Sequence, residues 1–417
     1  MDGATGLQTS VSHPEAGSLG LRGGPAVAAA DPLDGIDVRE DSLAAAFFRR
    51  GISRRRFIQF CAAMAAALAL PETMTPRIAR AVASSPRPPV IWREFQDCAG
   101  NTESMLRASH PDIAELVLET LDLEYHETLM AGAGTQAEEA SARIVRDYKG
   151  KYIAIIEGAI PTAENGVYCT IGGRTAVDIV REVTRDAALT IAIGACAWDG
   201  GLVVHGPTGA QGVAGVVGGL NLVNLGGCPH NAVNTAAVLV HYVTFGVPPE
   251  LDQFGRPLFA YGHLIHDQCE RRAHFDAGRY VEAWGDAGHR QGWCLYKMGC
   301  KGPAATYNCP TVRWNDGVTW PVKAGHGCIG CASPAFWGSM SPFYERLPDV
   351  RAFGFDASAQ TLGIGLVGAV AGLTVVHATG VAVKRRRARR AAVGAAGAVV
   401  YGPPEPDERS QGGGGSS

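Results

Sequence analysis

The stretch "LTIAIGACAWDGG", residues 189–201, decides the fold, because an uncharged run suited to a buried strand ends at a glycine and a cysteine. Similar short apolar runs occupy residues 90–95, 152–156 and 222–225, and helical patterns occupy 137–148, 174–186 and 231–245. Alternation of short apolar runs with helical segments is typical of parallel βαβ units. We therefore predict an α/β domain with a parallel sheet over residues 88–250.

Three cysteines follow predicted strands of this sheet. Cys98, Cys196 and Cys228 come after the runs that end at residues 95, 193 and 225. The carboxyl ends of parallel strands share one edge of a sheet, where open α/β folds bind ligands, so we expect the three thiols to gather there. Asn101 stands where a second cysteine would complete a C-x-x-C pair with Cys98.

Composition narrows the class of protein. A chain of 417 residues with 46% hydrophobic content can bury the cores of two domains. The net charge of -3 and the 18% charged content provide no broad basic surface, so we expect no nucleic-acid partner. Eleven cysteines in one chain indicate disulfides or metal clusters.

Residues 251–346 form a second predicted domain, rich in Gly, Trp and Cys, with little apolar periodicity. Zinc sites usually use two close ligand pairs, and only Cys328 and Cys331 form a close cysteine pair here. Disulfides remain an alternative in an exported protein. Ligation of iron-sulfur clusters by thiolates and one imidazole accounts most completely for the candidates, which are His266, Cys269, Cys294, Cys300, Cys309, Cys328 and Cys331.

The first 83 residues are typical of an exported protein. The motif "SRRRFIQ" at 53–59 precedes an apolar stretch at 61–70 and A-x-A patterns at 79–81 and 81–83, as in a twin-arginine signal peptide. Residues 1–50 then form a disordered leader. The alternative is a basic patch beside a short buried helix. Because the twin-arginine route carries folded proteins, the signal is consistent with a metal centre inserted before export.

The C-terminal region predicts a membrane anchor. Residues 361–383 carry no formal charge and are followed by "KRRRARR". This length spans a bilayer, and the basic cluster favours a cytoplasmic tail over 384–417, with the bulk of the chain on the extracytoplasmic side of the cell membrane. His377 within the span is either a haem ligand or a tolerated polar residue.

Six segments of the chain together resemble one family. They are "WREFQDCAGNTES", "EGAIPTAENGVYCTIGG", "GACAWDGG", "NLGGCPHN", "HLIHDQCERR" and "NCPTVRWNDGVTWPVKAGHGCIGC". In this order they resemble the small, electron-transferring subunit of membrane-bound nickel-iron hydrogenases. The resemblance runs from about residue 92 to 336 and implies a flavodoxin-like domain followed by an irregular iron-sulfur cluster domain.

The resemblance also implies three clusters and their ligands. A proximal 4Fe-4S cluster would use Cys98, Cys196 and Cys228, with position 101 as the usual fourth ligand. A medial 3Fe-4S cluster would use Cys309, Cys328 and Cys331, with Pro321 in the place of a fourth cysteine. A distal 4Fe-4S cluster would use His266, Cys269, Cys294 and Cys300.

Asn101 is where the chain departs from the family pattern. Its side-chain carbonyl could bind iron, as could an aspartate formed there by deamidation. Asp97, water or Cys169 could instead complete the site, or the cluster could lack one iron. An oxygen ligand would change the reduction potential of the cluster.

As the resemblance implies, this chain conducts electrons and contributes no catalytic residue of its own. The nickel-iron centre lies in a separate hydrogenase large subunit, and a membrane cytochrome b or a quinone-linked protein accepts the electrons. A higher-order oligomer of heterodimers is expected. The alternatives are a cluster subunit of a quinone oxidoreductase, which would lack the second cluster domain, and a disulfide- or zinc-stapled cell-surface binding protein.

Overall fold

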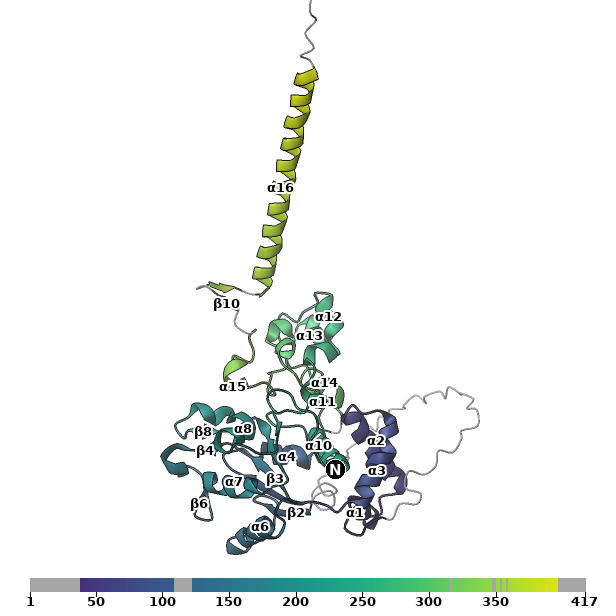
Figure 1. Ribbon diagram of the computed structural model, residues 1–417, viewed down its shortest axis with the longest axis vertical. Helices are drawn as coiled ribbons and strands as arrows, with labels where there is room; N and C mark the ends of the chain where they lie inside the picture. Colours follow the sequence, from purple (N-terminus) through teal and green to yellow (C-terminus); the bar gives the residue numbers. More distant parts are fainter. Residues whose placement is uncertain are drawn as a thin grey trace, which may run out of the picture. The chain divides into compact units, whose positions relative to one another are not determined.

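The computed structural model describes residues 38–108, 122–315, 317–346, 350–352, 355–357 and 359–396. The chain divides into two compact units, Met1–Arg346 and Leu347–Ser417. All eleven candidate cluster ligands lie in the first unit. The predicted domains over 88–250 and 251–346 are therefore parts of one compact body (Figure 1).

A five-stranded parallel sheet forms the centre of the first unit. Its strands are β1 (Pro89–Glu94), β2 (Asp122–His126), β3 (Ile153–Glu157), β7 (Leu189–Ile193) and β9 (Leu222–Leu225). They lie in the order β2-β1-β3-β7-β9. Counted along the chain this is the doubly wound order 2-1-3-4-5, as in flavodoxin, so the prediction of a parallel α/β sheet is confirmed.

Alternate residues of each strand face two separate cores. Ile91, Ala154 and Ile156 pack in the core that includes α6 (Thr135–Asp147) and α7 (Ala176–Arg185). Their neighbours along the strands, such as Trp92 and Ile155, pack in the core that includes α10 (Ala232–Phe245). Helices thus cover both faces, which explains why the strands read as continuous apolar runs.

Side-chain caps set the start of two of these helices. The Thr175 hydroxyl accepts from the Asp178 backbone N–H at the start of α7, and the Asn231 side chain accepts from Val233 N at the start of α10. The predicted helix over 174–186 therefore begins two residues late, since Arg174–Thr175 (β6) pairs with Thr170–Ile171 (β5) in a hairpin. Shorter elements complete the domain: α4 (Gly100–Leu106), β4 (Ile160–Pro161), α8 (Gly194–Asp199), β8 (Ala210–Gln211) and α9 (Val213–Val216).

Three N-terminal helices pack on the α10 side of the sheet. They are α1 (Leu43–Arg49), α2 (Arg54–Ala67) and α3 (Thr75–Ser84), and Figure 1 shows them side by side. Their apolar faces join the same core as α10. The structure differs here from the predicted disordered leader, because residues 43–49 are helical: Ser42 caps α1, and Phe47 packs against Phe57 and Phe60. Residues 1–37 lie outside the described residues.

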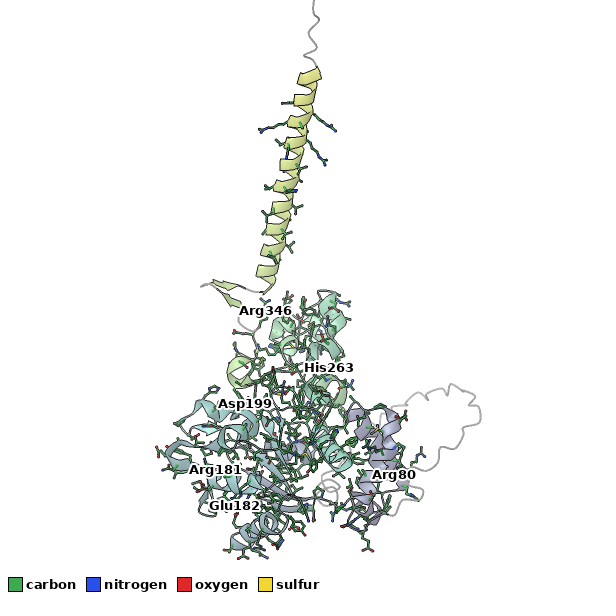
Figure 2. All side chains as sticks on the ribbon, viewed as in Figure 1. Arg80, Arg181, Glu182, Asp199, His263 and Arg346 are labelled. Carbon is green, nitrogen blue, oxygen red and sulfur yellow. The ribbon has the colours of Figure 1, made fainter. Side chains whose placement is uncertain are left out.

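The two A-x-A patterns lie within α3. Ala79 and Ala83 are fully buried, whereas Arg80, labelled in Figure 2, is exposed. Helix α2 likewise buries Phe57, which belongs to the twin-arginine motif. In the uncleaved chain the helices that carry the motif and the A-x-A patterns are therefore partly buried, and the twin-arginine signal stays a prediction.

Residues 251–346 contain short helices and turns joined by loops, as the weak periodicity predicted. This part shares the sheet's core through residues such as Tyr261, Ile265 and Trp320. Its helices are α11 (Leu258–Tyr261), α12 (Arg272–Asp276), α13 (Ala287–Arg290), α14 (Cys309–Val312) and α15 (Phe336–Ser339).

The second unit contains one long helix, α16 (Ala359–Ala396), preceded by the strand pair β10 (Val350–Ala352) and β11 (Phe355–Ala357). The segment Gly363–Arg390 is long and apolar enough to cross a membrane, with a mean hydropathy of 1.9. The described side chains of α16 project outward around the helix (Figure 2). The predicted span over 361–383 lies within this helix, which continues into the predicted tail.

Candidate metal centres

The first candidate centre lies at the carboxyl edge of the sheet. The loops after β1, β7 and β9 bring Cys98, Cys196 and Cys228 to one cavity of about 380 Å³. Asn101, in the first turn of α4, lines the same cavity. Cys98 and Cys228 are exposed at its mouth. The structure therefore brings together the four residues that the sequence assigned to the proximal site.

Local backbone conformation turns these loops toward the cavity. Ala99 has a left-handed φ of 53°, which reverses the chain between Cys98 and the start of α4. Gly194 has a φ of 80°, which lets the chain turn sharply from β7 into α8 and place Cys196 there. Cys196 therefore lies only three residues after the end of β7.

The Asn101 side chain is buried, with 4% of its surface exposed. Its Oδ1 accepts from the His230 backbone N–H at 2.9 Å and lies 3.2 Å from His230 Nδ1. Its Nδ2 faces the Ile193 carbonyl at 3.5 Å and Cys196 Sγ at 3.7 Å. Burial lowers the pKa of His230 to about 3, so its imidazole is neutral.

The second candidate centre is a mostly apolar cavity of about 310 Å³. Cys309, Cys328 and Cys331 line it, together with Pro321 and Trp320. These are the three cysteines and the proline of the predicted medial site. The three thiols are surrounded by aromatic and aliphatic side chains, so burial raises the pKa of each of them.

The third candidate centre brings together the predicted distal ligands. His266, Cys269, Cys294 and Cys300 all line one cavity. This cavity is narrow, about 20 Å³, and its four ligand residues line it together with Arg271 and Tyr296. His266 is half-buried and packs edge-on against Phe275, with ring centroids 4.5 Å apart. Burial, reinforced by Arg272, lowers the pKa of His266, which favours the neutral imidazole that binds metal.

The three cavities adjoin one another in a row. Cys228 and Pro229 line both the first and the second cavity. Ile265 lines both the second and the third. The Cys328 backbone N–H, in the second centre, donates to Cys300 Sγ of the third at 3.3 Å. The set with three cysteines and a proline therefore lies between the other two.

The cysteines are suited to bind a cationic group larger than one ion. All eleven are free thiols, and burial raises the pKa of Cys196 to about 12 and that of Cys228 and Cys294 to about 11. Thiols held this way favour protonation unless a metal replaces the proton. Sulfurs around one tetrahedral zinc would lie about 3.8 Å apart. Among the described residues, no set of three cysteine or histidine ligand atoms lies within 4.8 Å of one another.

Backbone N–H groups point at several of these sulfurs. Arg271 N lies 3.4 Å from Cys269 Sγ, and Gly330 N lies 3.3 Å from Cys328 Sγ. Such donors stabilise anionic sulfur and are among the features that set the potential of iron-sulfur clusters. The donor set of each cavity thus fits a thiolate-bound cluster, and none of these cysteines forms a disulfide in the structure.

Sequence comparisons identify the family of this chain. Residues 261–344 match the family model for the C-terminal part of the NiFe/NiFeSe hydrogenase small subunit, and residues 98–242 match that of NADH ubiquinone oxidoreductase, 20 Kd subunit. The uptake hydrogenase small subunit of Azotobacter vinelandii is 44% identical over 339 residues, which cover 81% of this chain and 94% of that protein. The chain belongs to the nickel-iron hydrogenase small-subunit family.

A second curated relative and a solved structure support the same family. The hydrogenase-2 small chain of Escherichia coli K12 is 45% identical over 343 residues, 78% of this chain and 92% of that one. A solved [NiFeSe]-hydrogenase structure from Dm. baculatum matches with a TM-score of 0.59 and 33% identity, covering 63% of this chain and 100% of the other. The small subunit is thus part of a hydrogen-oxidising enzyme, relays electrons through iron-sulfur clusters, and pairs with a large subunit that carries the nickel-iron centre.

The family matches distinguish the hydrogenase prediction from its two alternatives. The match over residues 98–242 spans the sheet domain, which explains the likeness to quinone oxidoreductases. The match over 261–344 adds the second domain that such an oxidoreductase was predicted to lack. A disulfide- or zinc-stapled binding protein finds no support in these relatives.

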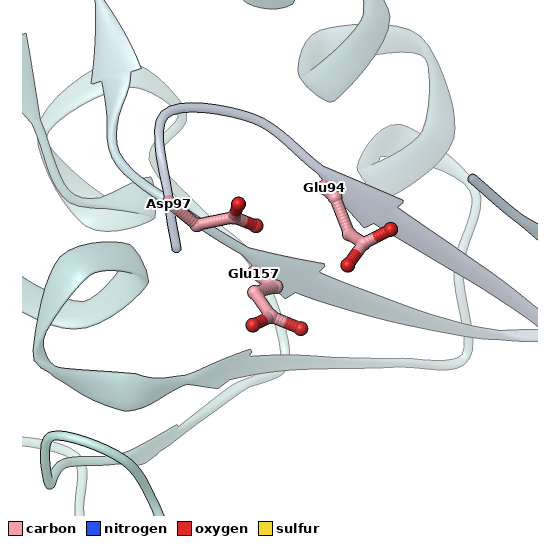
Figure 3. A group of neighbouring side chains, drawn as sticks. All are labelled: Glu94, Asp97 and Glu157. Carbon is pink, nitrogen blue, oxygen red and sulfur yellow. The ribbon is translucent and has the colours of Figure 1, made fainter. Parts of the chain in front are cut away.

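A network of carboxylates lies beside the first centre of the small subunit, and the sequence alone did not predict it. Figure 3 shows Glu94 and Glu157 on β1 and β3 and Asp97 on the loop after β1, with ligand oxygens within 4.8 Å of one another. Glu157 accepts from the backbone N–H groups of Asn101 and Thr102 and from the Thr102 hydroxyl. These bonds use the carboxylate to hold the start of α4, so we assign it a positioning role rather than a metal site.

Asp97 differs from its two neighbours in the network. The residue as a whole is exposed beside the first cavity, but neighbouring groups partly enclose its carboxyl group, and this loss of hydration together with the Glu157 charge raises its pKa to about 7. The sequence held one signal for the network, because Glu94 and Glu157 adjoin the ends of predicted strands.

Arg256 and Asp199 each make a contact that joins the second domain to the sheet domain. Arg256 pairs with Asp252 at 2.8 Å, donates to the Ala332 carbonyl at 2.6 Å and lies over the Trp198 ring at 5.2 Å. Asp199, labelled in Figure 2, accepts from the Ala335 backbone N–H at 2.6 Å. Because Trp198 and Asp199 adjoin Cys196, and Ala332 adjoins Cys331, these contacts hold the first two centres in register.

Proposed function

We propose that the small subunit binds three iron-sulfur clusters with the ligands that its three cavities provide. The proximal set is Cys98, Cys196 and Cys228 with position 101; the medial set is Cys309, Cys328 and Cys331; the distal set is His266, Cys269, Cys294 and Cys300. The predicted clusters are 4Fe-4S, 3Fe-4S and 4Fe-4S in that order. When bound, they supply one-electron transfer. The observation that carries the proposal is the row of cavities with shared walls.

The chain's own residues organise this relay. Backbone N–H groups of Arg271, Gly330 and Cys328 donate to ligand sulfurs and offset the charge of the thiolates. Trp320 and Tyr307 line the medial cavity and limit access of water. Neutral His266 contributes no negative charge to the distal set, which suits the end of the relay nearest an acceptor.

The large subunit would dock at the proximal edge. Cys98 and Cys228 are exposed there, as are Leu202 (58%) and Val204 (38%) in the η4 turn (Gly201–His205) beside the cavity. An exposed cluster of this kind needs a cover to exclude water and oxygen from the electron path. A partner with an apolar surface that carries the nickel-iron centre fits this face.

The membrane acceptor and the topology follow from α16. Its apolar span would anchor the subunit by one pass, with the basic residues after position 383 in the cytoplasm and the cluster domains outside. A membrane cytochrome b or quinone-linked protein would then receive electrons from the distal centre, and heterodimers could assemble further through the anchor. Residues up to 83 would serve as the twin-arginine signal.

The ligand sets are tested by removing one cysteine from each. We expect Cys228→Ala and Cys294→Ala each to lower iron by about four atoms per chain, and Cys331→Ala by about three. The control is Cys169→Ala, because Cys169 is not among the residues that line the three cavities. Iron is measured on anaerobically purified heterodimer, with EPR of each cluster. The proposal fails if the control loses as much iron as the others, or if wild type binds none.

A further inference from the structure

The environment of Asn101 determines what its side chain can do at the proximal centre. The amide group is held between two chain segments, the end of β7 at Ile193 and the loop at His230. Its own backbone N–H donates to Glu157 Oε1 at 3.1 Å. The amide is therefore fixed by the fold and does not point freely into the cavity.

The orientation of the Asn101 amide follows from two backbone partners, one of which can only donate and the other only accept a hydrogen bond. The His230 backbone nitrogen is a donor, so the Asn101 atom 2.9 Å from it must be the oxygen. The Ile193 carbonyl is an acceptor, so the atom 3.5 Å from it must be the nitrogen. The Asn101 Nδ2 group therefore also faces Cys196 Sγ, 3.7 Å away.

The oxygen of the amide has little capacity left for a metal. One of its two lone pairs accepts from the His230 backbone, and the His230 Nδ1 atom 3.2 Å away takes the other when it carries the ring proton. With the proton on Nδ1, the buried and unpartnered Nε2 of His230 is a bare acceptor, which costs less than a buried N–H without a partner. Binding iron through Oδ1 would break these bonds.

The space that the amide fills depends on the glycine at position 194. A Cβ atom at Gly194 would lie 2.5 Å from Asn101 Nδ2 and 2.6 Å from Oδ1, so the glycine leaves the space that the amide fills. The positive φ of 80° at Gly194 is open to glycine with little strain. The contact that makes room for the amide is therefore part of the turn that carries Cys196.

We propose that Asn101 is a positioning residue that donates a hydrogen bond from Nδ2 to the Cys196 thiolate, and that the chain holds the proximal cluster through three thiolates. This inference rests on the proposed function, since it requires the cluster. It deepens that proposal, because Asn101 is then no longer a ligand of iron and instead donates a hydrogen bond to Cys196 Sγ. The fourth corner of the cluster then lacks an iron or binds a group other than this amide.

The test compares three proteins as anaerobically purified heterodimers: wild type, Asn101→Ala and the isosteric Asn101→Asp. We expect Asn101→Ala to keep the iron content and the proximal EPR signal of wild type. Its proximal potential should shift to lower values, because loss of the N–H donor destabilises the reduced, more negative cluster. Asn101→Asp should shift the potential in the same direction, since it keeps the shape but lacks the N–H and adds a charge.

A second measurement detects the proposed N–H proton directly. ENDOR of the proximal cluster, recorded on protein produced in H2O and in D2O, should show exchangeable proton couplings in wild type, and Asn101→Ala should lack the coupling that the Asn101 amide contributes beside those of the backbone N–H groups. Loss of proximal iron in Asn101→Ala with iron retained in Asn101→Asp would show an oxygen ligand and overturn the inference. Identical exchangeable couplings in wild type and Asn101→Ala would also overturn it. A wild-type protein without clusters would instead refute the proposed function.

Discussion

Replacing Phe57 with alanine tests whether the N-terminal helices are a separately docked layer on the sheet domain. The Phe57 ring is fully buried and packs edge-on against Phe47 at 5.8 Å and Phe48 at 5.6 Å. Truncation of a buried phenylalanine costs about 3–5 kcal/mol, a range that includes the loss of such ring contacts. At about 1.4 kcal/mol per factor of ten, opening of the layer should become more frequent by about a hundredfold to several thousandfold.

Native-state hydrogen exchange of the uncleaved chain measures this opening. Amides of α2 and α3 should lose protection by this factor in Phe57→Ala, while amides of β3 and β7 keep theirs, because local units of a fold open independently of its core. The matched control is Gln59→Ala, whose side chain is exposed two residues away on the same helix, with an expected change within about 0.5 kcal/mol.

Two results would refute this reasoning. Equal loss of protection in β3 and β7 would mean that the helices unfold only with the whole domain. Unchanged exchange in α2 would mean that Phe57 is not packed as the structure shows. The outcome matters for the predicted twin-arginine signal, because an export machinery and a peptidase would have to reach Phe57 and the buried Ala79 and Ala83.

Three further predictions concern other parts of the chain. Burial raises the pKa of Cys61 to about 12, so its alkylation rate in the uncleaved chain should rise about tenfold per pH unit between pH 8 and 11, as mass spectrometry can follow. Arg256→Met should destabilise the junction of the two domains by about 3–5 kcal/mol, because the Asp252 carboxylate loses its buried partner; exchange at residues 330–340 should rise, and less so in Arg256→Lys. Removing residues 359–417 should move the heterodimer from the membrane to the soluble fraction, and persistence in membranes would refute the anchor.

The strands were predictable where burial on both faces makes them uniformly apolar. The runs at 189–193 and 222–225 match β7 and β9 to the residue. Strand β2 (Asp122–His126) was not predicted. It is an edge strand paired only with β1, and its sequence "DLEYH" contains charged side chains. The packing of α1, α2 and α3 on the sheet domain was not predicted for another reason: an apolar helix is visible in the sequence, but the surface on which it docks is not.

The candidate site was predictable to the extent that topology alone determines it. Cys98, Cys196 and Cys228 meet because each follows a parallel strand. The ligands of the second domain lie on loops without periodicity, so their grouping came from the family resemblance. The role of Asn101 depends on His230, which is 129 positions away in sequence, and no local pattern relates the two.

The placement of His230 shows why one substitution at the proximal site involves three strands. His230 follows β9, Ile193 ends β7 and Glu157 ends β3, so the partners of Asn101 come from every strand beyond β1 on that side of the sheet. The same strand order that gathers the cysteines therefore also encloses the residue between them. A polar side chain at position 101 is accommodated because groups that follow β7 and β9 satisfy its amide, while Glu157 at the end of β3 accepts from its backbone N–H.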